Sequence, residues 1–392
     1  MLTQRQIFLN NVAQTSSFPM GLEIEKAEGL HIWDINKKKY IDLIAGISVS
    51  NVGHRHPTVI KAIEKQLGLY MHLMVYGEYI QTPQLELAKK ITDLLPSSLD
   101  NVFFVNSGSE AIEGAMKLAK RFTGRQEIIA FTNAYHGSTQ GALSLSSDES
   151  RKLPFKPLLP SIQWIDLNES GQLSMITEET ACVIIEPIQG EAGVRESKKS
   201  FMTELRNKCN ETQTLLIFDE IQTGFGRTGK MFAFEHYDIV PDIITFAKGM
   251  GGGMPIGAFV SSKEIMQTLT FEPVLGHIST FGGHPVCCAS AIGCIDALVE
   301  ENMIANIDSK SKIFKEKLSN LSIVKDYRSK GLLIAVEFDD FETNKRIIDK
   351  CIENGVITDW FLFSPQSMRI APPLNITLDE CELACELVIK SL

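Results

Sequence analysis

The chain has 392 residues, of which 44% are hydrophobic and 22% are charged, a composition typical of globular proteins rather than of disordered ones. This length allows two domains, or one large domain with a smaller partner. With 38 Lys and Arg against 48 Asp and Glu, the formal net charge is −10 and no dense basic stripe occurs, which disfavours nucleic acid and anionic membranes as partners.

Apolar runs and cysteines indicate the compartment. No apolar run approaches the ~18 residues that a membrane helix needs. The polar segment 1–6 leads into no apolar stretch of the kind found in signal peptides. The eight cysteines have no paired CxxC spacing, which favours reduced thiols over a disulfide framework. We therefore expect a cytoplasmic protein.

The N-terminal part of the chain predicts a small antiparallel meander. Residues 21–25 and 30–34 alternate apolar and polar side chains at period two, with a turn at Glu28 and Gly29 between them. From about residue 57 the pattern changes to alternating helices and strands. Helices are expected at 58–69, at 83–95 and from the end of a short buried strand at 102–105 to about residue 122.

The middle of the chain predicts a mostly parallel sheet covered on both faces. Further buried strands are expected at 127–131, 182–185, 215–218, 243–246 and 256–260, several with predicted helices between them. After residue 281 the pattern becomes helical again and then mixes short strands with helices, which indicates a C-terminal subdomain joined by the N-terminal meander. The expected elements there are helices at 285–300, 303–321, 342–354 and 378–391 and strands within 331–338.

Lys248 and Asp219 lie at the ends of two of these apolar strands. Lys248 is followed by the glycine-rich loop 249–253, which has too few side chains to crowd a ligand. A lysine amine can form an imine with an aldehyde, and a carboxylate can keep a ring nitrogen protonated. The pair therefore predicts pyridoxal 5'-phosphate (PLP) as cofactor.

Other strand ends carry further polar groups. Ser107 and Glu110 have capping-box spacing at a predicted helix start, and Gly108 lets a ligand approach the backbone. This turn therefore suits a phosphate, although an ordinary capped helix has the same pattern. Tyr135 could stack on a flat ring, although Tyr and His are also common at strand ends. Glu186 ends a further strand, and ligands of α/β proteins gather at such ends.

Two further patterns are poor candidates for sites. Residues 224–230 match G-x-G-x-x-G and part of a P-loop, but Met231 stands where a P-loop has Ser or Thr, and no helix is expected to open on the glycines. His54 and His56 have no carboxylate or cysteine at metal-ligand spacing, so a helix entry with Pro57 in its first turn is the better interpretation. We expect no metal site.

Together these segments resemble the class III (ω-) aminotransferases of PLP fold type I, and within them the acetylornithine and ornithine aminotransferase branch. The resemblance covers nearly the whole chain, from Asp42 to Pro373, with its motifs in the family's order. The segments that carry it are 106–111, 135–137, 186–191, 218–224 and 247–249.

The resemblance implies a fold and a set of roles. It implies an α/β fold, with a large PLP-binding domain at 51–280, built on a mostly parallel mixed sheet flanked by helices, and a smaller α+β domain formed by 1–50 and 281–392. Lys248 would carry the Schiff base and move the proton, and the amino group would pass through pyridoxamine phosphate. The implied cofactor contacts are Asp219 at the ring nitrogen, Ser107, Gly108 and Ser109 at the phosphate, Tyr135 and His136 beside the ring, Glu186 positioning it and Gln222 at its phenolic oxygen.

The resemblance also implies a homodimer and a substrate clamp. Thr280 would reach the phosphate of the neighbouring subunit. Arg369 would bind a substrate carboxylate, and Glu191 would pair with Arg369. The substrates would be a small-molecule amino donor and a 2-oxo acid such as 2-oxoglutarate.

Ser138 departs from the pattern of the branch, in which an arginine follows the aromatic-His-Gly motif. Serine cannot supply the two-pronged contact that arginine gives a carboxylate. The donor therefore stays open between acetylornithine or ornithine, another ω-amino acid, and an amine used with pyruvate. Alternatives on the same fold are an aminomutase or decarboxylase reaction and, less favoured because Lys248 and Asp219 are both present, a non-catalytic PLP-fold protein.

Overall fold

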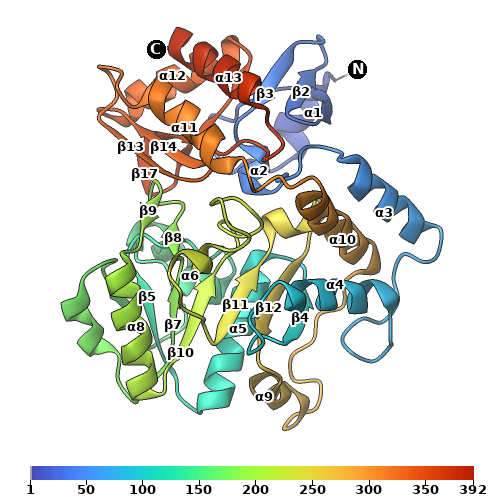
Figure 1. The fold of residues 1–392 in the computed structure, drawn as a ribbon, viewed down its shortest axis with the longest axis vertical. Coiled ribbons are helices and arrows are strands. Elements are labelled where there is room, and N and C mark those ends of the chain that lie inside the picture. Colours follow the sequence, from blue (N-terminus) through green and yellow to red (C-terminus); the bar gives the residue numbers. More distant parts are fainter. Residues whose placement is uncertain (1) are drawn as a thin grey trace.

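The largest sheet forms the centre of the computed structural model, which describes residues 2–392 (Figure 1). The strand β12 (Gly257–Ser261) runs antiparallel to its neighbours β11 and β4, whereas the pairs among β11, β10, β7, β5 and β6 are parallel. The predicted mostly parallel sheet is therefore confirmed. Its order is β4 (Asn101–Val105), β12, β11 (Ile243–Phe246), β10 (Leu215–Asp219), β7 (Thr180–Ile185), β5 (Glu127–Phe131) and β6 (Ile162–Ile165).

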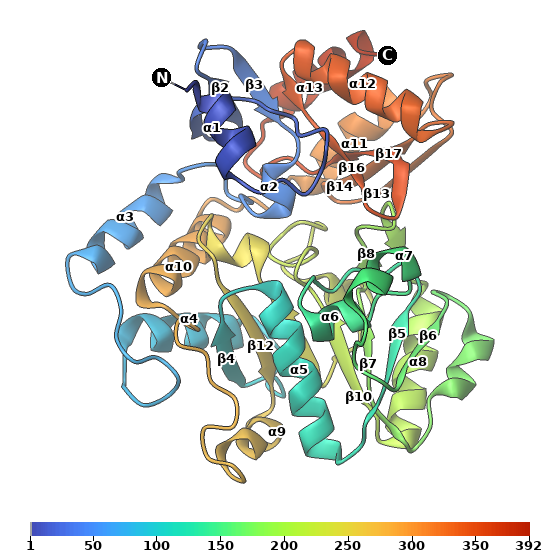
Figure 2. The same ribbon diagram turned by 180° about the vertical axis from the view of Figure 1, so that it is seen from behind.

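Alternate residues of each central strand face different helices. In β5, Ile128 belongs to the hydrophobic cluster that contains α5 (Gly108–Thr123), whereas Ile129 belongs to the cluster that contains α8 (Lys199–Thr212). Both side chains are completely buried. Because successive side chains of a strand point to opposite faces, a strand covered on both faces reads as a continuous apolar run. Figures 1 and 2 show α8 and α5 on the two sides of the sheet.

The two ends of the chain lie together above this sheet in Figure 1. β3 (Lys39–Asp42) pairs in parallel with β15 (Val356–Ile357), so an N-terminal meander and a C-terminal strand share one sheet. That sheet has the order β1 (Ile24–Glu28), β2 (His31–Asp34), β3 and β15. A second sheet has the order β13 (Asp326–Lys330), β14 (Leu333–Glu337), β17 (Ser364–Ile370) and β16 (Asp359–Phe361), with α11 (Ile307–Leu318), α12 (Phe341–Glu353) and α13 (Leu378–Lys390) beside them.

One long helix after the central sheet returns toward the N-terminal half of the chain. α10 (Pro285–Glu300) packs against α3 (Pro57–Leu67) and α4 (Thr82–Asp93).

The division of the chain into domain segments 1–50, 51–280 and 281–392 stays a prediction. The remaining short elements are α1 (Gln4–Asn11), α2 (Ala45–Ser48), α6 (Gln140–Ser144), α7 (Glu149–Lys152), α9 (Lys263–Met266), β8 (Ile188–Gln189), β9 (Arg195–Glu196) and the 3-10 turns η1 (Leu153–Phe155), η2 (Ser170–Met175), η3 (Ala233–His236), η4 (Lys248–Gly251) and η5 (Gln267–Thr270).

The structure differs from the expected elements in several places, among them the first strand of the meander, which is Ile24–Glu28 rather than 21–25. β6 was not expected, because its sequence Ile-Gln-Trp-Ile is only partly buried at the sheet edge. The segment 331–338 is one arm of a hairpin, since Gly331 takes a φ of 57° and turns the chain between β13 and β14. The helix expected from 303 begins only at Ile307.

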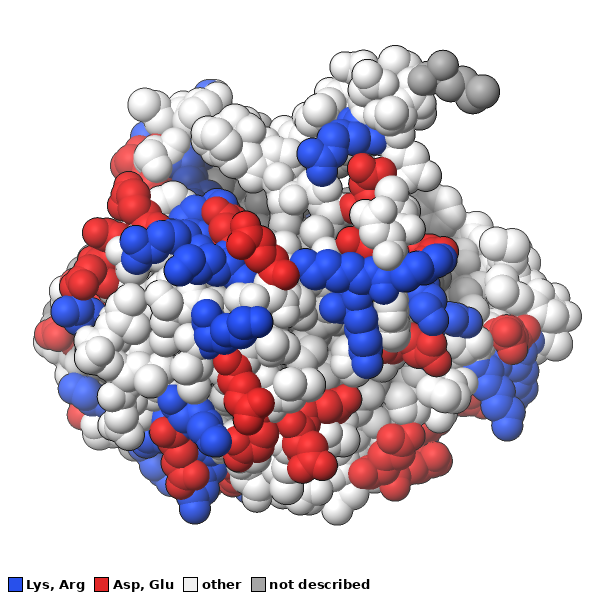
Figure 3. Space-filling model, turned by 90° about the horizontal axis from the view of Figure 1, so that it is seen from above, with Lys and Arg blue, Asp and Glu red and all other residues white. Residues whose placement is uncertain are grey.

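Basic and acidic side chains are interspersed over the side shown in Figure 3. Within residues 2–392, no helix combines the length and the apolar character needed to span a membrane.

Candidate active site

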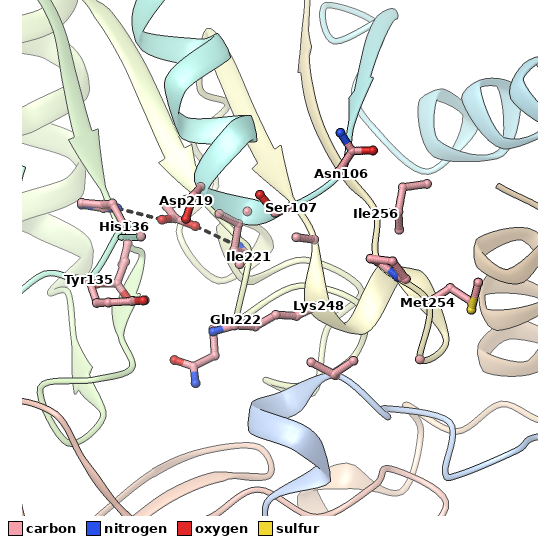
Figure 4. Close-up of a pocket in the computed structure, with 18 residues that line it drawn as sticks. Asn106, Ser107, Tyr135, His136, Asp219, Ile221, Gln222, Lys248, Met254 and Ile256 are labelled. Carbon is pink, nitrogen blue, oxygen red and sulfur yellow. Dashed lines mark hydrogen bonds and ion pairs between the residues drawn. The ribbon is translucent and has the colours of Figure 1, made fainter. Parts of the chain in front are cut away.

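A cavity of about 420 Å³ lies at the carboxyl ends of the central strands (Figure 4). Parallel strands bring their carboxyl ends to one edge of a sheet, so residues far apart in sequence meet there. The sequence-predicted residues that line the cavity are Ser107, Gly108, Ser109, Tyr135, His136, Glu186, Asp219, Gln222 and Lys248.

Lys248 lies two residues after the end of β11 and begins the turn η4. Its φ is 38°, in the left-handed region that a side chain other than glycine rarely adopts, and such strain is common at functional sites. Burial lowers the pKa of Lys248 below its ordinary value, and the nearby Arg369 acts in the same direction, while the charge of Glu191 opposes both. The structure therefore favours the neutral amine more than water does.

Asp219 ends β10 and is bound from two sides. Its Oδ2 lies 2.7 Å from Nδ1 of His136, and its Oδ1 accepts a hydrogen bond from the Ile221 N–H at 3.0 Å (Figure 4). Burial alone would lower the pKa of His136, but the hydrogen bond and charge of Asp219 outweigh it and raise the pKa. The result is a fixed carboxylate beside the cavity.

Glu186 positions the loop that carries Tyr135. Its Oε1 accepts from the Tyr135 N–H at 2.9 Å and its Oε2 from the Gly190 N–H at 3.1 Å. Burial, with the charge of Asp219 added, raises the pKa of Glu186 to about 7, although the charge of His136 opposes the shift. The tyrosine ring lines the cavity, and its hydroxyl lies 3.1 Å from Oγ of Ser138.

The N-terminus of α5 opens into the same cavity. Oγ of Ser107 accepts from the Glu110 N–H at 3.2 Å, as the capping spacing predicts. The Glu110 carboxylate, however, accepts from the Asn106 N–H at 2.8 Å, so the reciprocal half of the capping box is displaced by one residue. The first-turn N–H groups of Gly108 and Ser109 have no partner inside the helix by construction and can receive an anion.

Arg369 forms a buried cluster with two carboxylates. Nη1 and Nη2 donate to Oε1 and Oε2 of Glu191 at 2.7 and 3.0 Å, and Nε donates to Oδ1 of Asp359 at 2.9 Å. Burial alone would lower the pKa of Arg369, but the two carboxylates raise it. Burial would likewise raise the pKa of Glu191, but the charge of Arg369 reverses this and lowers it. The predicted pairing of Glu191 with Arg369 is present in the structure.

Asp359 is the member of this cluster that sequence analysis missed. Burial raises the pKa of its carboxyl to about 6, although the charge of Arg369 opposes the shift. The only signal in the sequence is one acidic residue in the otherwise apolar segment 356–361. An acidic residue in such a segment is usually at a solvated strand end, so the sequence alone does not indicate its partner.

Three other predicted residues take different places. Gln222 is buried and its Nε2 lies 3.4 Å from Oε1 of Glu191. Ser138 is exposed at the mouth of a second cavity next to Tyr135. Thr280 is exposed and, among residues 2–392, does not line the cavity of its own chain.

The arrangement fits the shape and charge of PLP. A flat ring fits a narrow cavity. Gly137, with a φ of 132°, has no Cβ, and a Cβ added there would lie 2.2 Å from Oγ of Ser109. The helix N-terminus suits the phosphate, Asp219 suits a ring nitrogen, and the amine of Lys248 suits the aldehyde. Nε2 of His136 is buried and, within the described chain, has no hydrogen-bond partner.

Comparison with known proteins decides the family. The sequence profile of the class-III aminotransferases matches residues 12–392. The chain belongs to the class-III aminotransferase family. It is a PLP-dependent transaminase with the PLP fold type I, as the sequence predicted.

Several members of this family resemble the chain closely. The acetylornithine aminotransferase of Methanopyrus kandleri is 40% identical over 371 residues, 94% of this chain and 93% of the relative. The [LysW]-aminoadipate semialdehyde/glutamate semialdehyde transaminase of Sulfurisphaera tokodaii is 41% identical over 322 residues, 81% of this chain and 82% of the relative. The crystal structure of the ornithine aminotransferase of Toxoplasma gondii, 30% identical, superposes with a TM-score of 0.91 over 100% of this chain and 95% of the other.

Proposed function

We propose that this transaminase moves the amino group of an ω-amino acid, of the acetylornithine or ornithine kind, to a 2-oxo acid such as 2-oxoglutarate. The observation that carries the proposal is Lys248, half-buried just after β11 in the same cavity as Asp219 and the start of α5. The activities of the relatives support the substrate class.

We assign the cofactor contacts to the residues of the cavity. Ser107, Gly108 and Ser109 would hold the phosphate at the positive end of α5. Other side chains would position the ring: Tyr135 by stacking, Asp219 at its nitrogen with His136 behind it, Glu186 through the loop it binds, and Gln222 at the phenolic oxygen. PLP bound in this way supplies an electron sink for the electrons of a broken C–H bond.

Lys248 is the group that would move the proton. An amine can accept a proton only when it is neutral, and burial lowers its pKa in that direction. Asp219, whose oxygens are bound by His136 and by the Ile221 N–H, would hold the ring nitrogen of the cofactor. The cavity thus brings together an amine whose pKa is lowered and a carboxylate held by hydrogen bonds.

Arg369 would bind a carboxylate of the substrate when Glu191 moves away. In the structure Glu191 occupies the two-pronged face of the guanidinium that a substrate carboxylate would need. An oxo acid with two carboxylates can displace Glu191, whereas an amine without a second carboxylate leaves the pair intact. The pair would therefore let one site accept both kinds of substrate.

A second candidate function is the transamination of ω-amines with pyruvate as acceptor. Two observations favour it: Ser138 carries no charge, and Arg369 is bound by Asp359 as well as by Glu191. Two carboxylates on one guanidinium leave a net negative cluster, which disfavours a substrate with a second carboxylate. A donor screen with both acceptors separates the two candidates.

We also propose that the functional unit is a homodimer in which Thr280 reaches the phosphate of the neighbouring site. The exposed apolar side chains around Thr280 support it: Phe271, Val274, Leu275, Ile278 and Phe281 are each about half or more exposed. A cytoplasmic location stays a prediction from the sequence.

The test of the function is the first half-reaction followed by absorbance. Adding ornithine or N-acetylornithine without an acceptor should convert the visible absorbance of the bound cofactor to that of its amino form, and 2-oxoglutarate should reverse the change. Lys248→Ala should lose both the original band and turnover. Lys312→Ala, which changes an exposed lysine elsewhere, is the control. Retained turnover in Lys248→Ala would refute the role given to Lys248.

A further inference from the structure

A second cavity, of about 540 Å³, lies against the active site. It shares Tyr135, His136 and Gly137 with the cavity that contains Lys248, and Ser138 lies at the junction. Its far wall comes from α7, η1 and the turn between β16 and β17, through Arg151, Phe155 and Phe363. A substrate chain that begins at Lys248 and passes Tyr135 would enter this cavity.

The charge in this second cavity is concentrated on one residue. Apart from His136, which is bound to Asp219, Arg151 is the only charged side chain among the described residues that line it, and no carboxylate does so. The rest of the wall is apolar or neutral, with Ala142, Leu143, Pro154 and Phe155 beside Arg151. Such a cavity suits an aliphatic chain that ends in an anion.

Arg151 is held in place by three contacts. Nε lies 3.2 Å from Oδ2 of Asp148, and Nη2 donates to the Leu362 carbonyl oxygen at 3.3 Å. The guanidinium carbon lies 5.4 Å from the ring centre of Phe363. These contacts use one hydrogen on each of two nitrogens, so the remaining N–H groups of the fork can bind a ligand. The side chain is 43% exposed and therefore accessible.

The two arginines near the active site differ in availability. Both prongs of Arg369 are occupied by Glu191 and its Nε by Asp359, so a carboxylate must displace a buried ion pair to reach it. Arg151 requires no such displacement. Leu362 links the two positions, because its N–H donates to Oε2 of Glu191 at 3.1 Å while its carbonyl oxygen accepts from Arg151.

We propose that Arg151 binds the carboxylate of the amino donor, and so supplies the positive charge that Ser138 does not. The proposal rests on the proposed function and narrows it, since it selects ω-amino acids over amines without a carboxylate. The aliphatic part of the donor lies along the apolar wall, its amine lies at Lys248, and its carboxylate lies on the open edge of the Arg151 guanidinium.

The test compares donors in pairs that differ only in the carboxylate. In the parent holoenzyme and in Arg151→Gln, 5-aminopentanoate is paired with butylamine, ornithine with 1,4-diaminobutane, and N-acetylornithine with N-acetyl-1,4-diaminobutane. For each pair that the enzyme uses, Arg151→Gln should lower kcat/KM for the donor with a carboxylate by about tenfold, mainly by raising KM. The kcat/KM for the amine without a carboxylate should stay unchanged. Arg151→Lys should retain part of the preference because it retains the charge but not the fork.

Arg346→Gln is the matched control, because Arg346 is exposed on α12 and lines neither cavity. An equal loss for both members of a pair, or no loss for either, would overturn the role of Arg151 while leaving the proposed function intact. A parent enzyme that uses none of these donors would contradict the proposed function instead. In that case the binding of pentanoate, measured through the absorbance of the bound cofactor, still tests the role of Arg151. An unchanged Kd for pentanoate in Arg151→Gln overturns the proposal, and about tenfold weaker binding supports it.

Discussion

At the scale of single residues, Asp359 changes what the Arg369 cluster can do. Arg369 would otherwise have one partner, Glu191, which a substrate carboxylate could replace without a change in net charge. Asp359 adds a second negative charge 2.9 Å from Nε of Arg369, and this charge remains when Glu191 leaves. An incoming carboxylate is therefore repelled by a group that it does not displace.

The first prediction concerns this repulsion and its pH dependence. Burial raises the pKa of Asp359 to about 6, so the carboxyl is neutral below that pH and ionised above it. The KM for 2-oxoglutarate should therefore rise as pH increases through 6. In Asp359→Asn the rise should be absent, and the KM above that pH should fall by about threefold to tenfold relative to the parent.

Steady-state kinetics with 2-oxoglutarate at a series of pH values measures this effect. Asp339→Asn is the control, since Asp339 is exposed and pairs with Lys325 away from the cavities. An identical pH profile in the parent and in Asp359→Asn would show that Asp359 does not affect acceptor binding.

At the scale of elements, the active site depends on the close approach of α5 to the loop after β5. The Ser138 N–H donates to Oγ of Ser109 at 3.3 Å, and Gly137 lies directly over Ser109. The loop can take this path because Gly137 adopts a φ of 132° and has no Cβ. The approach brings the loop that carries Tyr135 beside the N-terminus of α5.

The second prediction is that Gly137→Ala separates cofactor binding from folding. The added Cβ would lie 2.2 Å from Oγ of Ser109, so the loop must move away from α5. We expect PLP affinity to fall by about tenfold or more, because the strain and clash are worth roughly 1–3 kcal/mol. Titration of the apoenzyme with PLP, followed by absorbance, measures the loss.

Gly124→Ala provides the comparison for this experiment. Gly124 ends the same helix with a φ of 71°, but an added Cβ there would meet nothing within 4 Å. This variant should lose some thermal stability, as expected for alanine in the left-handed region, and bind PLP as the parent does. Equal PLP affinity in both variants would contradict the importance of the contact between Gly137 and Ser109.

The predicted elements show which parts of the fold are readable from sequence. β5, β11 and α10 have the expected bounds, because buried strands and long helices are specified by their own hydrophobic pattern. β6 was missed and the start of α11 was misplaced, because neither is marked by a local pattern. Elements at a sheet edge or after a turn depend on what packs against them.

At the scale of the whole molecule, the third prediction concerns the homodimer. Thr280 does not line the cavity of its own chain, within the part that the structure describes, and the segment around it is exposed and apolar. Light scattering should therefore give the mass of two chains at micromolar concentration. Phe281→Glu places a charge on this surface and should shift the protein toward monomer, with weaker PLP binding.

Mixed subunits test whether Thr280 acts across the interface. In a dimer of one Lys248→Ala chain and one Thr280→Ala chain, one site has Lys248 from the second chain and Thr280 from the first, and is complete. Such mixtures should bind PLP at that site with parent affinity, whereas the Thr280→Ala homodimer should bind it more weakly. If mixing does not restore affinity, Thr280 acts within its own chain or not at all.

The sequence by itself determined the cofactor chemistry of this protein. Lys248, Glu186 and the start of α5 come just after strands of the central sheet and Asp219 ends one, and strands that run in the same direction bring their carboxyl ends to one edge. The hydrophobic pattern that predicts the strands therefore also predicts which polar residues meet. This prediction does not depend on the distances between those polar residues.

Only the tertiary structure decided how the substrate end of the site is arranged. Arg369 and Glu191 are separated by 178 residues, and Asp359 and Arg151 come from yet other elements. Their contacts depend on how the C-terminal sheet packs over the central one, and no local pattern encodes that packing. In the structure two carboxylates bind Arg369, whereas part of the Arg151 guanidinium is accessible to a ligand. This difference supports the proposal that Arg151 binds the carboxylate of the donor.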